Sequence, residues 1–587
     1  MTPHNTAKRV IRHTALAVIA AVVLTACAGR PRAPQDEITI SILGTNDVHG
    51  QLLPAGDSGG LVTISAYVDA LRAARAEDNG AVLVIDAGDM WQGTLESNLV
   101  EGAAVVDAYN AIGFDAAAIG NHEFDFGPVG TKTIPENSDD DPRGALKQRV
   151  SEANFPVLAA NLIDDRTAKP VAWDNVRPSI TIDVAGIKVG IIGVVTEHAL
   201  QTTISANTLG LRIAPLAETI VKEATELRDR GSSIIIVTAH AGSFCAEFSD
   251  PTDVSSCNMS GEIMRVAEAL PTGLVDHIIG GHVHEGIAHI VNGISITSSY
   301  SNTRAFSRVD LTVDRNTGAV VARDVHPPHS ACLFVVRSSG ECASSGDESS
   351  EVMAAIYAGR EIVPDPRVVE VAERAAAFAA ATKDEELGVY LESAFEHPPA
   401  TESALANLMT DAIRESTGAD ISIHNVVGGI RNILPQGELT FGAVYEMFPF
   451  DNRVVKLELT GAELRNIFAE QAHNHRRRAG FSGMRVFVSC TIDKMEVVMQ
   501  LANGSAVRDD DRLTVVVNDY LALGGDNILT PVIPQSGFDV DDSMPLTRDV
   551  LVEWFRRRGG SLNPEDFLTT ENPKWNVPDP LPGTCSL

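Results

Sequence analysis

Short runs of β-branched and other apolar residues alternate with longer amphipathic stretches through the first half of the chain. Helical periodicity marks the stretches Leu61–Arg75 and Leu216–Arg228. This alternation is typical of an α/β domain, which we expect at residues 38–345. The apolar runs between the helical stretches predict strands at Ile38–Leu43, Ala81–Ile85, Ala116–Ile119, Val189–Val195, Ser233–Val237 and His277–Ile279.

A second domain is expected beyond a linker region at residues 346–385. The segment 325–350 is rich in Cys, Ser and Gly and predicts irregular surface structure, whereas Ala-rich Asp365–Thr382 predicts a connecting helix. The helical sequence TESALANLMTDAIRES then opens the second domain, at 386–585. A chain of 587 residues is long enough for two domains with substantial cores.

The N-terminus has the pattern of a secretory signal. Basic residues precede an apolar run from Thr14 to Ala26, which is too short to span a bilayer, because spanning takes ~20 apolar residues. The ending LTAC resembles the bacterial lipobox, so we expect a lipoprotein signal at 1–27, lipidation of Cys27 and a tether at 28–37. No aspartate follows Cys27, which favours an outer-membrane anchor facing the periplasm or the cell surface. The alternative is a plain signal peptide with an incidental cysteine.

With Cys27 assigned to lipid, six of the seven cysteines remain. An even number in an exported chain favours disulfides, and closeness in sequence suggests the first two pairs. The sequence does not prove the connectivity, least of all for the last pair. A cysteine-bound metal is the alternative, but the chain has no CxxC pair. The expected disulfides are Cys245–Cys257, Cys332–Cys342 and Cys490–Cys585.

The charge of the chain limits its partners. A formal net charge of −32 argues against binding a nucleic acid polymer, which requires a basic surface for the phosphate backbone. A small phosphorylated substrate is still compatible with this charge if metal ions and a few arginines reverse the local field.

Polar clusters follow the predicted strands of the first domain. The carboxyl ends of sheet strands are where α/β proteins collect ligand groups, so these clusters can converge on one point. We expect the remaining histidines His198, His277, His289, His424 and His473 to be structural or solvated. The clusters are GTNDVHG with Asp47 and His49, DAGD with Asp89, GNHEFD with Asn121 and His122, TAHAG with His240, and GGHVHE with His282 and His284.

The chemistry of these side chains indicates a metal centre. Carboxylates, imidazoles and one amide form a mixed oxygen and nitrogen ligand set, which suits Zn, Mn, Fe or Co. The number of ligands is enough for two divalent ions with one bridging carboxylate. Such paired ions lie ~3.5–4 Å apart and clamp a transferring phosphoryl group.

The five motifs, in this order, resemble the calcineurin-like binuclear metallophosphoesterases, whose pattern is DxH, GD, GNH(E/D), H and GHxH. The resemblance implies a four-layer α/β sandwich in which Asp89 bridges the two ions. It also implies that His122 stabilises the transition state and that Asp125 holds its ring. By the same resemblance, one ion is held by Asp47, His49, Asp89 and His284, and the other by Asp89, Asn121, His240 and His282.

The second half of the chain is similar to the α+β C-terminal domain of the 5′-nucleotidases. The sequences that carry this resemblance are VVGGIR (426–431), FPFDNRVV (448–455), LELTGAELRNIF (457–468) and VNDYLALGGDN (517–527). The resemblance implies that Phe450 and Tyr520 sandwich a nucleobase, a stacking mode that tolerates different bases. Asp526 would accept hydrogen bonds from the ribose hydroxyls, Asn452 would contact the base edge, and Arg431 would contact the phosphate.

The chain departs from this family pattern at three places near the expected substrate. Many relatives carry phosphate-binding arginines before the helix that begins here near Glu402, but this chain reads HPPATESALAN. Phosphate binding then depends on Arg431, the metals and, as a further candidate, Arg453. Asn425 is displaced from the family position. Asp451 replaces a glycine and brings a negative charge near an anionic ligand.

These features predict an extracytoplasmic, metal-dependent phosphoric monoester hydrolase that releases phosphate from small nucleotides. The departures leave open a UDP-sugar hydrolase, a 2′,3′-cyclic nucleotide hydrolase or a thiosulfohydrolase-type esterase. A non-catalytic nucleotide-binding lipoprotein is the remaining alternative, although a binding module has no need for so many metal-directed groups. The sequence does not specify the native metals, the preferred base or the oligomeric state.

Overall fold

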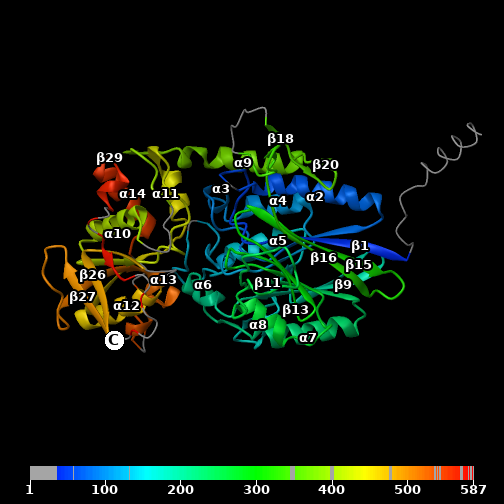
Figure 1. Cartoon of the computed structure of the whole chain (residues 1–587), viewed down its shortest axis with the longest axis horizontal. Helices are drawn as coiled ribbons and strands as arrows, with labels where there is room; N and C mark the ends of the chain where they lie inside the picture. Colours follow the sequence, from blue (N-terminus) through cyan, green and yellow to red (C-terminus); the bar gives the residue numbers. More distant parts are fainter. Residues whose placement is uncertain are drawn as a thin grey trace, which may run out of the picture.

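The structure is a computed structural model that describes most of the chain from residue 36 onward. The predicted signal and Cys27 lie outside the described residues, as does most of the arginine-free sequence before Glu402. Two units lie side by side along the long axis (Figure 1). The residues not described are 1–35, 57, 131, 344–350, 397–401, 475–478, 493, 535–536, 539, 541–543, 569–570, 572, 579–580, 582–584 and 586–587.

The first unit contains a seven-stranded sheet in the order β16-β15-β1-β2-β3-β4-β7. Strands β1, β2, β3, β4 and β7 run parallel to one another, while β15 pairs antiparallel with both β1 and β16. The strands are β1 (Glu37–Thr45), β2 (Ala81–Asp86), β3 (Ala116–Ala118), β4 (Val157–Leu158), β7 (Val176–Arg177), β15 (Ala305–Asp314) and β16 (Val320–Ser330).

A six-stranded sheet in the order β13-β14-β12-β11-β9-β8 faces the first sheet. Its centre is parallel, with β11 between β9 and β12. The strands are β8 (Ser179–Val184), β9 (Ile187–Val195), β11 (Ile234–His240), β12 (His277–Gly280), β13 (Gly286–Val291) and β14 (Ile294–Ser299). The six strands predicted from apolar runs therefore all form, and they lie in these two sheets.

Helices cover the outer face of each sheet. The first sheet carries α2 (Gly60–Glu77) and α4 (Ala103–Ile112), and α9 (Pro366–Lys383) packs over these two helices (Figure 1). The second sheet carries α7 (Leu216–Asp229) and α8 (Glu262–Ala269). Between the sheets lies a core of Ile, Leu and Val side chains. Central strands are buried on both faces, which explains their unbroken apolar runs. The expected four-layer α/β sandwich is confirmed.

The prediction of irregular structure from residue 325 is wrong at its start. Strand β16 continues to Ser330 through Pro327 and Pro328, because its pairing with β15 shifts between Phe306 and Arg308. At this irregularity the two prolines have no paired residue on β15, so no backbone N–H is needed from them. In addition, β16 is an edge strand, where proline is tolerated.

Short elements complete the first unit, and some follow the predicted domain boundary at residue 345. The hairpin β19–β20 contributes Tyr357 to the hydrophobic core that contains α2. Ile362, just after the hairpin, is also part of this core. These elements are α3 (Leu95–Asn98), α5 (Gly144–Glu152), α6 (Ser205–Thr208), β5 (Leu162–Asp164), β6 (Lys169–Pro170), β10 (Leu211–Ile213), β17 (Phe334–Val336), β18 (Val352–Ala354), β19 (Ile356–Tyr357) and β20 (Arg360–Glu361).

Helix α9 runs from the core of the first unit to the second unit (Figure 1). Its N-terminus is capped by Asp365, whose side chain accepts a hydrogen bond from the backbone N–H of Arg367 at 2.8 Å. Its last residue, Lys383, forms ion pairs with Glu96 of the first unit (2.8 Å) and Glu446 of the second (2.7 Å).

The second unit contains three small sheets and five α-helices among its described residues. The sheet orders are β23-β21-β29, β24-β28-β22-β25 and β27-β26-β30. The helices are α10 (Ala404–Thr417), α11 (Phe441–Met447), α12 (Gly461–His473), α13 (Asp519–Ala522) and α14 (Thr547–Arg558). The strands are β21 (Glu386–Leu391), β22 (Ile421–His424), β23 (Gly437–Thr440), β24 (Val454–Thr460), β25 (Gly480–Ser482), β26 (Met484–Thr491), β27 (Lys494–Leu501), β28 (Arg512–Asn518), β29 (Gly560–Leu562) and β30 (Trp575–Asn576).

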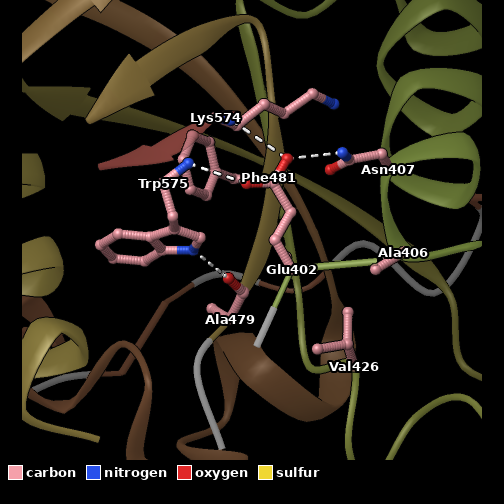
Figure 2. A pocket seen from close by; sticks show the side chains of 9 residues that line it. Glu402, Ala406, Asn407, Val426, Ala479, Phe481, Lys574 and Trp575 are labelled. Carbon is pink, nitrogen blue, oxygen red and sulfur yellow. Dashed lines mark hydrogen bonds between the residues drawn. The ribbon is translucent and has the colours of Figure 1, made fainter. Parts of the chain in front are cut away.

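Glu402 fastens the C-terminal strand to the second unit. Its carboxylate accepts hydrogen bonds from the side chain of Asn407 and from the backbone N–H groups of Lys574 and Trp575 around a small pocket (Figure 2). Three disulfides also form, with the expected pairing Cys245–Cys257, Cys332–Cys342 and Cys490–Cys585. None of the helices in the described part of the chain is long and apolar enough to cross a membrane.

Candidate metal centre and substrate face

The expected ligands lie together at the carboxyl ends of the parallel strands. Asp47 follows β1, Asp89 follows β2 and Asn121 follows β3 in the first sheet. In the second sheet, His240 is the last residue of β11, and the segment with His282 and His284 follows β12. The site is therefore built where the edges of the two sheets meet, which explains how distant motifs reach one point.

Five of these residues have an unusual backbone conformation. Positive φ angles occur at Asp47 (49°), His49 (50°), Asp89 (57°), His282 (76°) and His284 (60°). Residues other than glycine rarely adopt this left-handed conformation, and each instance costs on the order of 1–3 kcal/mol. The fold holds the loops in a strained form that aims these side chains inward.

The first group of candidate ligands is Asp47, His49 and His284. His49 donates its Nδ1–H to the carbonyl of Gln92 at 2.8 Å, so its Nε2 carries a lone pair. Nε2 of His49 lies 3.1 Å from Nε2 of His284, and this second nitrogen lies 3.4 Å from Oδ1 of Asp47. Asp47 is fixed by hydrogen bonds from the side chain of Asn46 (2.7 Å) and the backbone of His282 (2.9 Å).

The second group is Asp89, His240 and His282, joined by the amide of Asn121. His240 donates Nδ1–H to the carbonyl of Ala87 at 2.8 Å, so its Nε2 faces inward. Asn121 donates its amide nitrogen to the carbonyl of Thr202 and thereby turns Oδ1 inward as well. Nε2 of His240 lies 3.0 Å from that oxygen, 3.1 Å from Oδ2 of Asp89 and 3.3 Å from Nδ1 of His282.

Both groups bring lone pairs of oxygen and nitrogen face to face. A single proton can join only one such pair at a time, whereas a divalent cation attracts all the ligands at once, so the geometry fits a cation. Negative charge also dominates this region: burial favours a neutral His240, but the charges of Asp89 and Asp47 outweigh it and raise its pKa to about 10. Asp89 also accepts a hydrogen bond from the backbone of His122 at 2.9 Å.

His122 and Asp125 form a largely buried pair beside the candidate ligand groups. Nδ1 of His122 lies 2.6 Å from Oδ2 of Asp125, whose other oxygen accepts a hydrogen bond from Thr203 at 2.6 Å. Burial lowers the pKa of His122, but the charges of Asp125 and Asp89 outweigh it, and the net pKa is raised. The pair can therefore hold a proton on a ring that lies 5.5 Å from the His49 ring.

Glu123 is a residue of the site that the sequence reasoning did not single out. Its buried carboxylate accepts hydrogen bonds from the backbone N–H groups of Gly120 (2.6 Å), Met90 (2.7 Å) and Asp89 (3.0 Å). It thus ties the loop of Asp89 to the loop of Asn121. Burial and the nearby charge of Asp89 raise the pKa of Glu123 to about 7. Its only signal in the sequence was an acid inside the motif GNHEFD.

Arg431 of the second unit faces the metal centre. Its guanidinium lies 3.4 Å from Nδ1 of His284 and 5.1 Å from the centre of the Phe450 ring. Burial lowers the pKa of Arg431, and the acids Asp89, Asp47 and Asp526 oppose that shift. Arg431 is therefore a cation placed between the ligand acids of one unit and the expected ribose-binding acid of the other.

The ring of Phe450 closes this face of the site. It lies 5.6 Å from the ring of His122 and 5.5 Å from that of Phe448. Asp451, whose negative charge would repel an anionic ligand, forms an ion pair with Arg548 that offsets this charge. The guanidinium of Arg548 also lies 4.2 Å from the centre of the Tyr445 ring, so this segment is held within the second unit.

The other expected substrate residues lie in the same region with partners of their own. Asp526, at a positive φ of 51°, accepts a hydrogen bond from the side chain of Asn425 at 2.9 Å. Burial and the charge of Asp526 raise the pKa of Tyr520. Asn452 donates its amide to Asp519 at 2.9 Å. Arg453, the further candidate for phosphate binding, donates to the carbonyl of Met544 at 2.7 Å.

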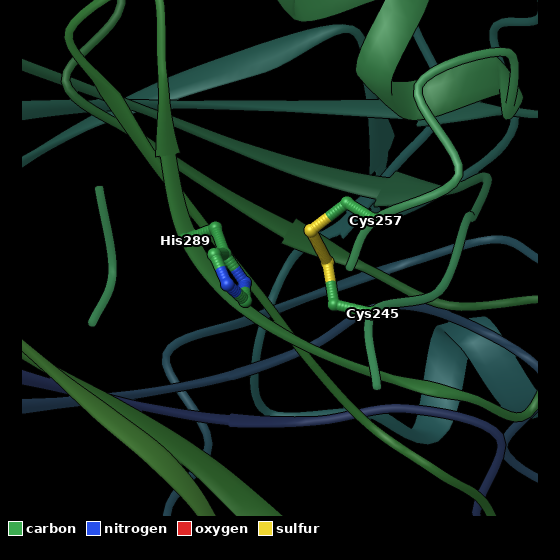
Figure 3. A group of neighbouring side chains, drawn as sticks. All are labelled: Cys245, Cys257 and His289. Atoms are coloured by element: carbon green, nitrogen blue, oxygen red, sulfur yellow. A yellow bond between two sulfur atoms is a disulfide. The ribbon is translucent and has the colours of Figure 1, made fainter. Parts of the chain in front are cut away.

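One more cluster of metal-type side chains lies apart from this centre. Cys245, Cys257 and His289 are close together, but the two sulfurs are joined in a disulfide and the imidazole lies beside it (Figure 3). The alternative of a cysteine-bound metal is therefore not supported. Among the other histidines expected to be structural, His277 and His424 are buried and bond to backbone carbonyls.

Comparison with known families identifies both halves of the chain. Residues 40–286 match the sequence model of the calcineurin-like phosphoesterases, and residues 379–532 match that of the 5′-nucleotidase C-terminal domain. The chain belongs to the 5′-nucleotidase family. Membership of this metallophosphoesterase family implies divalent metal ions, and the two ligand groups fit them.

Individual relatives of this family member are distant in sequence. It is 25% identical to a 5′-nucleotidase of Vibrio cholerae over 540 residues, covering 87% of this chain and 90% of that one. It is 28% identical to the endonuclease YhcR of Bacillus subtilis, covering 84% of this chain but 38% of that longer protein. The crystal structure of a 5′-nucleotidase precursor from Thermus thermophilus superposes with a TM-score of 0.69 at 22% identity, covering 92% and 99% of the two chains.

Proposed function

We propose that this protein is an extracytoplasmic phosphohydrolase that uses two divalent metal ions to release phosphate from nucleotides. The observation that carries the proposal is the convergence of inward-facing lone pairs beneath Arg431 and Phe450. One ion would be held by Asp47, His49, Asp89 and His284, and the other by Asp89, Asn121, His240 and His282. The chemistry of these ligands favours Zn, Mn, Fe or Co.

The paired ions, when bound, supply a nucleophilic hydroxide and neutralise charge on the phosphoryl group. His122 donates a proton or positive charge to the departing sugar oxygen, because Asp125 orients its ring and favours its protonated form. Arg431 binds the phosphate oxygens from the opposite side. This division gives the metal-bearing unit the chemistry and the second unit the recognition.

Recognition of the nucleoside is assigned to the second unit. Phe450 and Tyr520 would stack on the base, at about 1–3 kcal/mol per contact by alanine substitution in comparable sites. Asp526 would accept hydrogen bonds from the ribose hydroxyls, and Asn452 would contact the base edge. Stacking tolerates different bases, so we expect several nucleotides to be substrates.

The test is product release from three substrates, measured side by side on the purified full chain: phosphate from AMP, UMP and glucose 1-phosphate from UDP-glucose, and a nucleoside monophosphate from a 2′,3′-cyclic nucleotide. Chelator treatment should abolish release, and adding back Zn²⁺ or Mn²⁺ should restore it. Faster hydrolysis of AMP than of the other two supports the proposal. Release from UDP-glucose or the cyclic nucleotide alone would assign the alternative activities, and no release above the metal-free control would leave a binding protein.

The location follows from the N-terminal sequence rather than from the described residues. We infer that lipidation of Cys27 anchors the protein in the bacterial cell envelope, because the LTAC ending resembles a lipobox. Incorporation of a labelled fatty acid into the wild-type chain, and its loss in Cys27→Ser, is the expected result. Labelling of both proteins or of neither would contradict the anchor.

A further inference from the structure

Gln92 lies between the metal-ligand loop and the base-binding segment of the other unit. It is buried, three residues after Asp89, at the start of a loop that continues through Gly93. Its backbone carbonyl accepts the Nδ1–H of His49 at 2.8 Å. Its side-chain amide crosses to the second unit and donates to the carbonyl of Pro449 at 2.8 Å.

The acceptor of this hydrogen bond is next to Phe450. The peptide segment of Pro449 and Phe450 is held from both sides, because the carbonyl of Phe450 accepts a hydrogen bond from Arg548 at 3.2 Å. The Phe450 ring in this arrangement lies over His122 and beside Arg431. One residue therefore fixes the orientation of a ligand imidazole by its backbone and the position of the base-binding ring by its side chain.

We infer that Gln92 is a positioning residue that sets the distance between the base-binding ring and the metal ions, and so favours substrates that carry a nucleobase. The inference rests on the proposed function, since it assigns Phe450 to the base. A buried amide–carbonyl hydrogen bond contributes modestly, so its loss should change the specificity constant by about three- to tenfold. The expected change is in KM, because the contact acts on bound substrate and transition state alike.

The experiment compares AMP with ribose 5-phosphate, which has the same sugar phosphate and no base. In the metal-loaded full chain, Gln92→Leu should lower kcat/KM for AMP about three- to tenfold more than kcat/KM for ribose 5-phosphate. The backbone carbonyl that holds His49 is kept in this variant, so the metal content should equal that of the wild type. An equal loss with both substrates, or no loss with either, overturns the inference.

A matched control removes a different contact between the units. Tyr445→Phe deletes the hydroxyl that accepts a hydrogen bond from Asn98 at 2.8 Å and leaves the Tyr445 ring under Arg548 in place. The ratio of AMP to ribose 5-phosphate hydrolysis should stay at the wild-type value in this variant. The same shift in both variants would mean that general docking of the units, and not Gln92, sets the preference.

Binding of adenosine separates this inference from the proposed function, because it needs no catalysis. Calorimetry should show adenosine binding to the wild type and weaker binding to Gln92→Leu. Weaker binding to the variant supports the inference even if AMP is not hydrolysed, a result that would reject the proposed function alone. Equal binding to both proteins, or none to the wild type, overturns the inference.

Discussion

His122 and Asp125 are the side chains best placed to deliver a proton to a departing group. Their contact of 2.6 Å is partly buried, and Asp125 also accepts a hydrogen bond from Thr203. The resulting charge distribution keeps the His122 ring protonated to higher pH than a free imidazole. Substituting His122 should lower the rate, whereas substituting Asp125 should shift the pH dependence of the rate.

His122→Ala should lower kcat for AMP by about 10²- to 10⁴-fold, the usual contribution of a general acid. Asp125→Asn should instead move the alkaline decline of kcat to lower pH. The active imidazolium is lost as pH rises through its pKa, and loss of the Asp125 charge lowers that pKa. A pH–rate profile of each variant checks this, and an unshifted alkaline limb in Asp125→Asn would contradict the assignment.

Asp89 is the residue whose loss should affect both ions. Asp89→Asn removes one negative charge between the two ligand groups, so we expect lower metal content together with a loss of at least about a hundredfold in kcat. Elemental analysis after dialysis measures the metal, and Asp310→Asn, on β15 in the first unit, serves as the control carboxylate. Full metal occupancy in Asp89→Asn would contradict the proposal that Asp89 bridges the two ions.

The sequence indicated the candidate ligands because metal binding confines such side chains to short motifs after strands. It did not indicate Glu123 or Asn46, since Glu123 accepts hydrogen bonds from the loop of Asp89 and Met90, and Asn46 accepts one from the backbone of Ser299. Only the fold brings these partners together. It also could not predict the positive φ angles, because even Asp and His, which adopt that conformation more often than most residues, do so only in a minority of cases. Residues that position the candidate ligands through hydrogen bonds are therefore difficult to recognise in a single sequence.

Strands and helices of the first unit were predictable from their apolar patterns, but their ends were not. Strand β11 extends to His240, three residues past the predicted end, so this ligand lies within the strand. Strand β16 passes two prolines that normally end a strand, because edge position and irregular pairing remove the need for their N–H groups. Pairing partners, which decide both cases, are not visible in local sequence.

The disulfides should stabilise the two units by different amounts. In the chain-entropy model, Cys490–Cys585, with a separation of 95 residues, contributes about 5 kcal/mol, and Cys245–Cys257, with a separation of 12, about 3 kcal/mol. The Cys490→Ser/Cys585→Ser variant should therefore lower the denaturant midpoint of the second unit more than Cys245→Ser/Cys257→Ser lowers that of the first. A smaller effect of the longer loop would contradict this expectation.

The two units together form the complete site, since the ligands belong to one and Arg431 and Phe450 to the other. Their contacts include Gln92 with Pro449, Asn98 with Tyr445, and Lys383 with acids on both sides. The existence of two domains and a helical connector was predictable from length and composition. The contacts between them were not, because each joins residues far apart in the sequence.

A nucleotide held by both units has to enter and leave between them, so turnover should require the units to separate. A short bismaleimide cross-link between Asn98→Cys and Tyr445→Cys should lower AMP turnover at least about tenfold. The two single-cysteine variants treated with the same reagent are the controls. Unchanged turnover in the cross-linked protein would exclude this motion as part of the cycle.

Helix α9 limits where such a movement can turn. With 18 residues at 1.5 Å each, it is a rod about 27 Å long, embedded by Val368, Ala372 and Ala375 in the first core. A rod anchored over most of its length moves with the body that anchors it. The pivot of any swing therefore falls on Asp384 and Glu385, the two residues between the end of the helix and β21, and their stiffness would govern how fast the enzyme opens.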